Sequence, residues 1–451
     1  MAKIYDLAPN NRNLPLLLVK EMRKLEKDYM GLDFNINKRE NRRYHKIPRT
    51  SSAHYLISLQ KFVQQVVEEK EIEKMELWLV ADAYLKFLAG DFYAADKTFQ
   101  RIKPLISDET LLEQINVFQL ALKINAYSEV DEEDEDEISD IIRSNTYYKK
   151  HPDFHNYLFD KLSQDYAQNG KIAKAFRTLH PVADLHYNIP LDIVDDLLKI
   201  VYKEEHSHLE EAFITKDDGH SILHDLLDMK GVYYMTQFQL EAALETVNEI
   251  PPSERDTIKL HPYRDEILDC VNCTQTDTLS FTRTALVEKM LDLNYKARAD
   301  LQLGAQAFYE LGLLFYNLTY YGNCWKGMDF FRSGANWKYH NAKDVYPLDG
   351  SPNGNHENKD CSQALFYFEK ARLLTKNQEL AARATFMAAK CQHNAWYNHK
   401  DNKRSVYSNK IPKFPAEYQT YFDLLQADYR DTKFYGEAIK ECKYFRMYAL
   451  K

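Results

Sequence analysis

Residues 80–104, VADAYLKFLAGDFYAADKTFQRIKP, have the pattern of two short helices joined by a tight turn. Apolar residues at helical spacing lead up to Gly90, which we expect to end the first helix. On the second helix Ala95 is small enough to let the two helices approach closely, and Phe99 fills the space one turn later. Pro104 then closes the segment. This stretch therefore predicts a helical hairpin.

The same pattern recurs twice further along the chain. Residues 162–181, LSQDYAQNGKIAKAFRTLHP, again place a glycine between two periodic apolar stretches, and residues 229–252, MKGVYYMTQFQLEAALETVNEIPP, repeat the small and aromatic positions. Ala175 and Ala243 are 68 positions apart, which is twice a period of 34. The recurring positions are Tyr166, Gly170, Ala175, Leu179 and Pro181 in the first segment and Gly231, Tyr234, Ala243, Val247, Ile250 and Pro251 in the second.

These small, aromatic and proline positions resemble those of the tetratricopeptide repeat (TPR), a helix–turn–helix unit of 34 residues. The resemblance implies stacked helical hairpins that form a superhelix, so the predicted fold is all-α, a TPR-like α-solenoid over residues 1–451. Composition agrees, because 13 Gly and 14 Pro in 451 residues are too few for the frequent turns of a β-sandwich or barrel. One unit, residues 206–215, is irregular, with Leu209 near the expected alanine position.

Two strongly charged segments are predicted to be solvated connections. Residues 37–50 are rich in Lys and Arg and are predicted to be a basic linker between helices. Residues 129–137, EVDEEDEDE, are predicted to be an acidic loop because their carboxylates repel one another, and they lack the glycine that a calcium-binding loop needs. The net charge of −9 argues against a nucleic-acid partner.

A non-repeat insertion is predicted at residues 322–360. The preceding segment, AFYELGLLFYNLTYYGN (307–323), carries Gly312 like the first helix of a hairpin and is expected to stop at Gly322–Asn323. Its partner helix is expected only at residues 361–376, where Ala364 and Phe368 have the required spacing. A second interrupting loop is predicted at 399–415, and a terminal capping helix at 432–451.

Aromatic residues are concentrated around this insertion. Twelve occur between Phe308 and Tyr346, where the aromatic content of 13% predicts about five. Flat rings mixed with polar side chains are typical of binding surfaces, but an irregular insertion also needs a small core of its own. Both interpretations remain open. The candidate binding residues are Tyr320, Tyr321, Trp325, Trp337 and Tyr339.

The sequence carries no motif for catalysis, a metal or a cofactor. A phosphate-binding loop, a serine-hydrolase elbow and a dinucleotide fingerprint are all missing. We therefore predict no catalytic residues, no metal ligands and no cofactor. The weak exceptions are one CxxC, Cys270 with Cys273, and two histidine pairs at helical spacing, His151 with His155 and His220 with His224.

The predicted function is that of a non-catalytic scaffold that binds a segment of a partner protein on its repeat surface. The alternative is a module that binds a glycan or peptide on the aromatic insertion around residues 320–346. No membrane-spanning run is predicted, and the oligomeric state is left open. A cytoplasmic location is expected if Met1 is the natural start, and an exported or periplasmic one if the chain is a piece of a longer protein.

Overall fold

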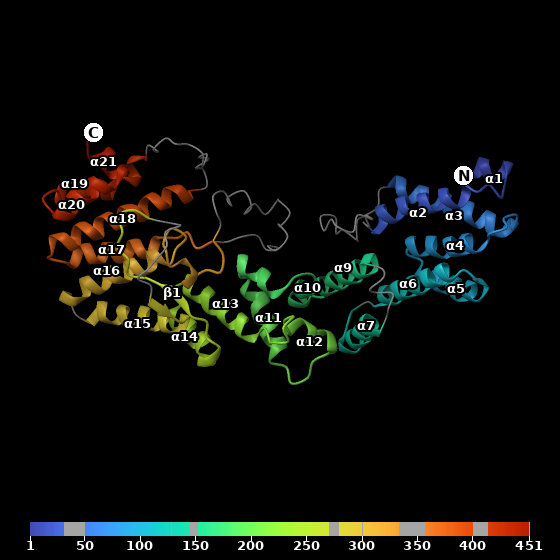
Figure 1. The fold of residues 1–451 in the computed structure, drawn as a ribbon, viewed down its shortest axis with the longest axis horizontal. Helices are drawn as coiled ribbons and strands as arrows, with labels where there is room; N and C mark the ends of the chain where they lie inside the picture. Colours follow the sequence, from blue (N-terminus) through green and yellow to red (C-terminus); the bar gives the residue numbers. More distant parts are fainter. Residues whose placement is uncertain are drawn as a thin grey trace. The chain divides into compact units, whose positions relative to one another are not determined.

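The computed structural model describes residues 1–30, 50–127, 129–144, 152–269, 279–299, 301–332, 357–399 and 414–450. These residues are predominantly helical, which confirms the all-α class, and they include one short two-stranded antiparallel sheet (Figure 1). The chain divides into two compact units. Unit 1 comprises residues 1–181 and 199–220, and unit 2 comprises residues 182–198 and 221–451. The TPR-like arrangement remains a prediction.

Unit 1 is built from helices that pack mainly on their neighbours in sequence. Helix α4 packs between α3 and α5, and α9 packs on α10. The core between them contains Trp78 and Phe99, both fully buried. The helices are α1 (Ala2–Leu7), α2 (Leu14–Met30), α3 (Thr50–Glu69), α4 (Glu76–Leu88), α5 (Phe92–Ile102), η2 (Lys103–Leu105, a 3₁₀ helix), α6 (Glu109–Ala126), α7 (Glu132–Ser144), α9 (Pro152–Gln168), α10 (Ile172–Leu179) and α12 (His208–Ile214).

The acidic loop predicted at 129–137 is wrong, because helix α7 begins at Glu132. Asp131 and Asp134 exchange side-chain to backbone hydrogen bonds at its start, and carboxylates in a first turn are favoured by the helix dipole. Glu135 turns inward and is fully buried. Its carboxylate accepts from Tyr166 and Ser207, and it pairs with Lys174. The repulsion that the sequence suggested is therefore offset by the partly buried Lys174 ammonium.

Unit 2 has the same neighbour-to-neighbour packing. Helices α15, α16, α17 and α18 follow one another side by side (Figure 1). Helix α11 (Leu191–Val201) has residues in both units. The other elements of unit 2 are η3 (Val182–Tyr187), α13 (Leu223–Thr236), α14 (Leu240–Asn248), η4 (Pro252–Glu254), β1 (Ile258–Leu260), β2 (Leu279–Phe281), α15 (Arg283–Ala299), α16 (Leu301–Asn317), η5 (Trp325–Gly327), α17 (Ser362–Leu374), α18 (Gln378–Asn398), η7 (Ala416–Tyr418), α19 (Thr420–Asp428), α20 (Lys433–Glu441) and α21 (Lys443–Ala449).

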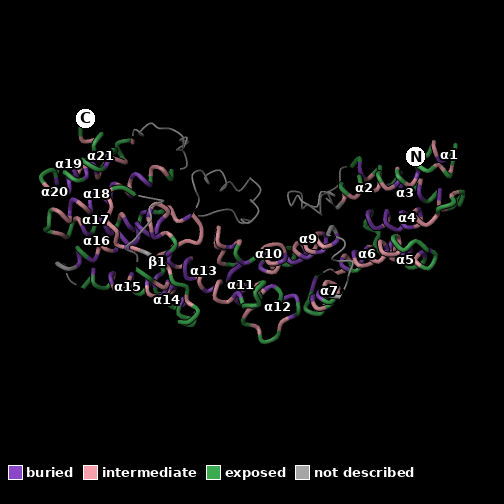
Figure 2. The backbone as a smooth tube through the Cα atoms, viewed as in Figure 1, coloured by how far each residue is buried: buried purple, intermediate pink, exposed green. Residues whose placement is uncertain are grey.

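Helix α18 is the centre of the carboxyl-terminal packing. It contacts α17, α19 and α20, and buried residues run along most of its length (Figure 2). Many of these are alanines, whose small side chains let neighbouring helices approach on several sides. The predicted pairing across the insertion is confirmed, because α17 packs on α16.

The recurring glycines act in two different ways. Gly90 and Gly170 follow α4 and α9 with φ of +79° and +75°, which is the left-handed conformation that ends a helix. Gly231 and Gly312 lie inside helices instead, where another helix comes close. A Cβ atom on Gly231 would stand 2.3 Å from Val247 Cγ1, and one on Gly312 would stand 2.6 Å from the Phe368 ring.

The other recurring residues lie mostly in the core. Tyr234 is half-buried and contacts the core from its edge, and Leu179 is half-buried as well. The two prolines, Pro181 and Pro251, are exposed, whereas the alanine and phenylalanine positions and Tyr166 are buried. The burial of most of these positions agrees with their predicted packing role. The buried set is Ala95, Phe99, Tyr166, Ala175, Ala243, Ala364 and Phe368.

Two predicted boundaries are wrong. Helix α16 ends at Asn317 rather than at Gly322, because the Asn317 amide donates to the carbonyls of Pro262 and Arg264 and its own carbonyl accepts from Cys324 N. The single helix predicted at 432–451 is two helices, α20 and α21, separated at Cys442. Cys442 has extended backbone angles, and its thiol accepts from Phe445 N to start α21.

Several predictions fall outside the described residues. They concern most of the basic linker, in 37–49, the centre of the insertion, in 333–356, with Trp337 and Tyr339, and most of the second loop, in 400–413. Cys270, Cys273 and His151 also lie outside.

The contribution of His393 on α18 to stability is expected to fall between pH 6.5 and pH 4. Burial lowers the pKa of His393 to about 4 from 6.5, and its ring stacks on Phe414 at 4.0 Å. The depressed pKa stabilises the fold above pH 6.5, and this contribution is lost as pH falls towards 4. The loss is about 3 kcal/mol over that interval.

His393→Phe keeps an aromatic ring at this position and cannot titrate. Its unfolding free energy, measured by urea titration at pH 7 and pH 5, should change less with pH than that of the wild type. The difference between the two proteins is the quantity to use, because Asp329, whose pKa is raised to about 6, contributes in the opposite direction. Parallel pH curves for the two proteins would contradict this role of His393.

Candidate binding groove

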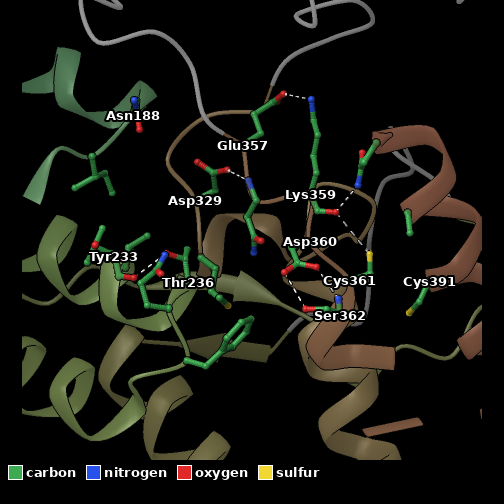
Figure 3. Close-up of a pocket in the computed structure, with 18 of the residues that line it drawn as sticks. Asn188, Tyr233, Thr236, Asp329, Glu357, Lys359, Asp360, Cys361, Ser362 and Cys391 are labelled. Atoms are coloured by element: carbon green, nitrogen blue, oxygen red, sulfur yellow. Dashed lines mark hydrogen bonds and ion pairs between the residues drawn. The ribbon is translucent and has the colours of Figure 1, made fainter. Parts of the chain in front are cut away.

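A groove of about 1110 Å³ lies within unit 2. One side is formed by residues that follow η3 and by α13, with Asn188, Tyr233 and Thr236 (Figure 3). The opposite side is formed by residues 357–362 at the start of α17 and by the last turns of α18. The volume exceeds the ~300–1,000 Å³ of typical small-molecule pockets, so the groove has room for a stretch of polymer.

Asp329 lies in the groove and holds two segments of the chain together. One carboxylate oxygen accepts the backbone N–H groups of Phe330, at 2.8 Å, and Phe331, at 3.2 Å. The other accepts from Asn358 N at 3.2 Å (Figure 3). Burial raises the pKa of Asp329 to about 6, against the effect of these three hydrogen bonds. Because both oxygens already have backbone donors, this carboxylate organises the groove wall.

The two other carboxylates of the groove also have local partners. The buried Glu357 pairs with Lys359 at 2.8 Å, and the Lys359 ammonium lies 4.8 Å from the Tyr320 ring centre. The exposed Asp360 accepts from the backbone N–H and the hydroxyl of Ser362, both at 2.8 Å, at the first turn of α17. These contacts hold residues 357–362 in a defined conformation at the groove wall. Residues 357–361 have no regular secondary structure, and α17 begins at Ser362.

A polar network lies behind this wall. Tyr316 donates to Asp269 at 2.7 Å, and Lys390 donates to the other oxygen of Asp269 at 2.6 Å. Asn394 donates to the Tyr316 oxygen and lies 3.9 Å from the Cys361 sulfur. Burial raises the pKa of the Cys391 thiol well above its usual range, which makes it a poor nucleophile. The network therefore stabilises the junction of α16, α17 and α18.

The predicted aromatic residues that the structure describes are engaged within the fold. Tyr320 is flanked by Lys359 and by the Arg332 guanidinium, at 5.2 Å. Tyr321 donates to Asn398 at 2.5 Å. Trp325 is half-buried beside Lys326. These three residues do not line the groove.

Phe330 and Phe331 connect the insertion to η3. The Phe330 ring stacks on the His186 ring, with 4.4 Å between their centres, and the Arg283 guanidinium lies 4.5 Å from the centre of the Phe330 ring. The Phe331 ring contacts Tyr187, with 4.8 Å between their ring centres. Burial, with the nearby Arg283, lowers the pKa of His186, so this groove residue is neutral at pH 7. For these two phenylalanines the structure supports the interpretation of a local core.

Sequence reasoning missed the groove itself. It singled out the insertion, in which Asp329 and Glu357 lie, but selected its rings rather than its carboxylates. The remaining wall residues come mainly from η3 and the residues after it, from α13 and from α18, which are distant in sequence and carry no motif. The sequence signal that could have indicated the groove was a set of carboxylates close to polar residues, namely Asp329, Glu357 and Asp360 with Asn358 and Ser362.

The described residues contain no group of three or more His, Cys, Asp or Glu side chains arranged to hold a metal ion. No helix among them is long and apolar enough to cross a membrane. Comparisons with protein-family models, curated proteins and solved structures found no match to this chain.

Proposed function

We propose that this protein is a non-catalytic scaffold and that the groove of unit 2 binds a segment of a partner protein. The groove supports this proposal by its size and its lining. Apolar side chains such as Phe238, Met328 and Leu365 alternate with amide and hydroxyl groups, a mixture that suits the side chains and backbone of a peptide. The TPR-like stacking of hairpins as the supporting framework is part of this proposal.

The chemistry of the groove favours binding over catalysis. Asp329, the carboxylate with the raised pKa, has its oxygens occupied by three backbone donors, which suits a structural role better than proton transfer. The alternative of a glycan stacked on the insertion is less well supported. Tyr320 is flanked by two cations, and Tyr321 is tied to Asn398, so neither ring offers a free platform.

Filling the groove tests the proposal. Ala395 is exposed on α18 and lines the groove, so Ala395→Trp should obstruct the site with little effect on the core. Proteins captured from a lysate of the native host by the wild type should be depleted at least ~10-fold on the variant, which corresponds to about 1.4 kcal/mol. Quantitative mass spectrometry provides the measurement.

Ala427→Trp is the matched control, because Ala427 is exposed on α19 and does not line the groove. It should retain the captured proteins, and circular dichroism should show unchanged helicity for both variants. If Ala395→Trp captures the same proteins in the same amounts as the control, the groove is not the binding site.

A further inference from the structure

We infer that the occupant of the groove is a peptide segment with a lysine or arginine side chain, which pairs with Asp360. This inference rests on the proposed function and names the chemical class of its partner. Three carboxylates and one ammonium are present among the described residues that line the groove. The ammonium belongs to Lys359, which is already paired with Glu357.

The environment of each carboxylate points to Asp360 as the contact. Glu357 is buried and neutralised by Lys359, and Asp329 is hydrogen-bonded to three backbone N–H groups. Asp360 is exposed immediately before α17 and accepts two hydrogen bonds from Ser362 (Figure 3). Among the described residues it has no cationic partner, so its charge is uncompensated there. A carboxylate accepts about four hydrogen bonds, so Asp360 can still receive those of an ammonium or guanidinium group.

The rest of the lining fits the remainder of such a segment. The stem of a lysine or arginine is apolar and can lie along Phe238 and Leu365. The excess of carboxylates disfavours acidic peptides and the phosphates of nucleic acids. His186 adds no positive charge at pH 7, because burial lowers its pKa. Charge and shape thus select a basic, partly apolar peptide.

The test uses three pools of short fluorescent degenerate peptides with a fixed central residue, which is lysine, glutamine or glutamate. Binding to the full chain is followed by fluorescence polarisation. The lysine pool should bind roughly three to ten times more tightly than the glutamine pool, with the glutamate pool weakest, and raising the salt concentration should reduce this preference.

Asp360→Asn removes the charge and keeps the contact with Ser362, since that hydroxyl can accept a hydrogen bond as well as donate one. The variant should lose the preference for lysine and bind the glutamine pool unchanged. Asp423→Asn, at an exposed acid on α19 outside the groove, should behave like the wild type.

The outcomes separate the two proposals. If the glutamine or glutamate pool binds as tightly as the lysine pool and Ala395→Trp blocks all of them, the groove binds peptides but the basic preference is wrong. If Asp360→Asn keeps the full preference, Asp360 is not the contact. If no pool binds and Ala395→Trp also captures the same lysate proteins as the wild type, the proposed function itself is overturned.

Discussion

Replacing Lys174 by methionine is expected to destabilise the protein by about 3–5 kcal/mol, because it leaves two buried carboxylates without their shared cation. The Lys174 ammonium lies 2.6 Å from Glu135 Oε1 and 2.7 Å from Glu210 Oε1. Both glutamate side chains are at most 2% exposed. Glu210 retains Lys203 as a partner, but among the described residues Glu135 keeps only the hydroxyl donors Tyr166 and Ser207. Unfolding by urea would measure the loss.

Lys123→Met is the matched control. Lys123 pairs with Glu137, and both side chains of this pair are nearly half exposed. Its loss should cost less than about 1 kcal/mol. The loss of stability caused by Lys174→Met should also become smaller as pH falls towards 5, since a buried carboxylate without a cation becomes protonated at a higher pH. Equal stabilities of the two variants would show that the buried pair contributes no more than a surface pair.

Phe368→Ala is expected to cost about 3–5 kcal/mol through the cavity it leaves between α16 and α17. Phe368 is fully buried, and its ring lies against Gly312, where no side chain is present to fill the space. Tyr309 on α16 contacts the same ring at 5.7 Å. The measurement is the free energy of unfolding by urea, with the two-state behaviour of unit 2 checked by a second probe.

Phe366→Ala is the control on the same helix, because Phe366 is 49% exposed, and its loss should cost less than about 1 kcal/mol.

The contact between Gly312 and the Phe368 ring also predicts that substitutions at these two positions have coupled effects on stability. Gly312→Ala should destabilise by about 1–3 kcal/mol, since the new Cβ would collide with the Phe368 ring, and Phe368→Leu should relieve part of that cost. Strictly additive effects in this double-mutant cycle would contradict the close approach.

Local signals explain what the sequence predicted well. The hairpin at Gly90 depends on neighbouring residues alone, and its turn has the expected left-handed glycine. The pairing of α16 with α17 was also predictable, because Gly312 and Phe368 mark a close contact even across a long insertion. Such features lie within one helix or between two helices of one hairpin.

Features that depend on distant residues were not predictable. The acidic run was assigned to a loop because Glu135 finds its cation and hydroxyl donors on α9, α10 and the start of α12. The groove was missed for the same reason, since Asp329 acquires its role only when Asn358 is brought beside it. Charge alone did not show which carboxylates would be buried.

The Glu135 contacts also bear on synthesis at the ribosome. Ser207, one partner of Glu135, follows it by 72 residues, and Glu210, which shares the Lys174 cation with Glu135, comes later still. At about 5–20 residues per second, the nascent chain exposes the acidic segment for roughly 4–14 s before its last partners are made. Its surrounding carboxylates keep the segment hydrated during that time. We therefore expect the charges that α7 accommodates in the folded state to limit aggregation of this segment before its partners are made.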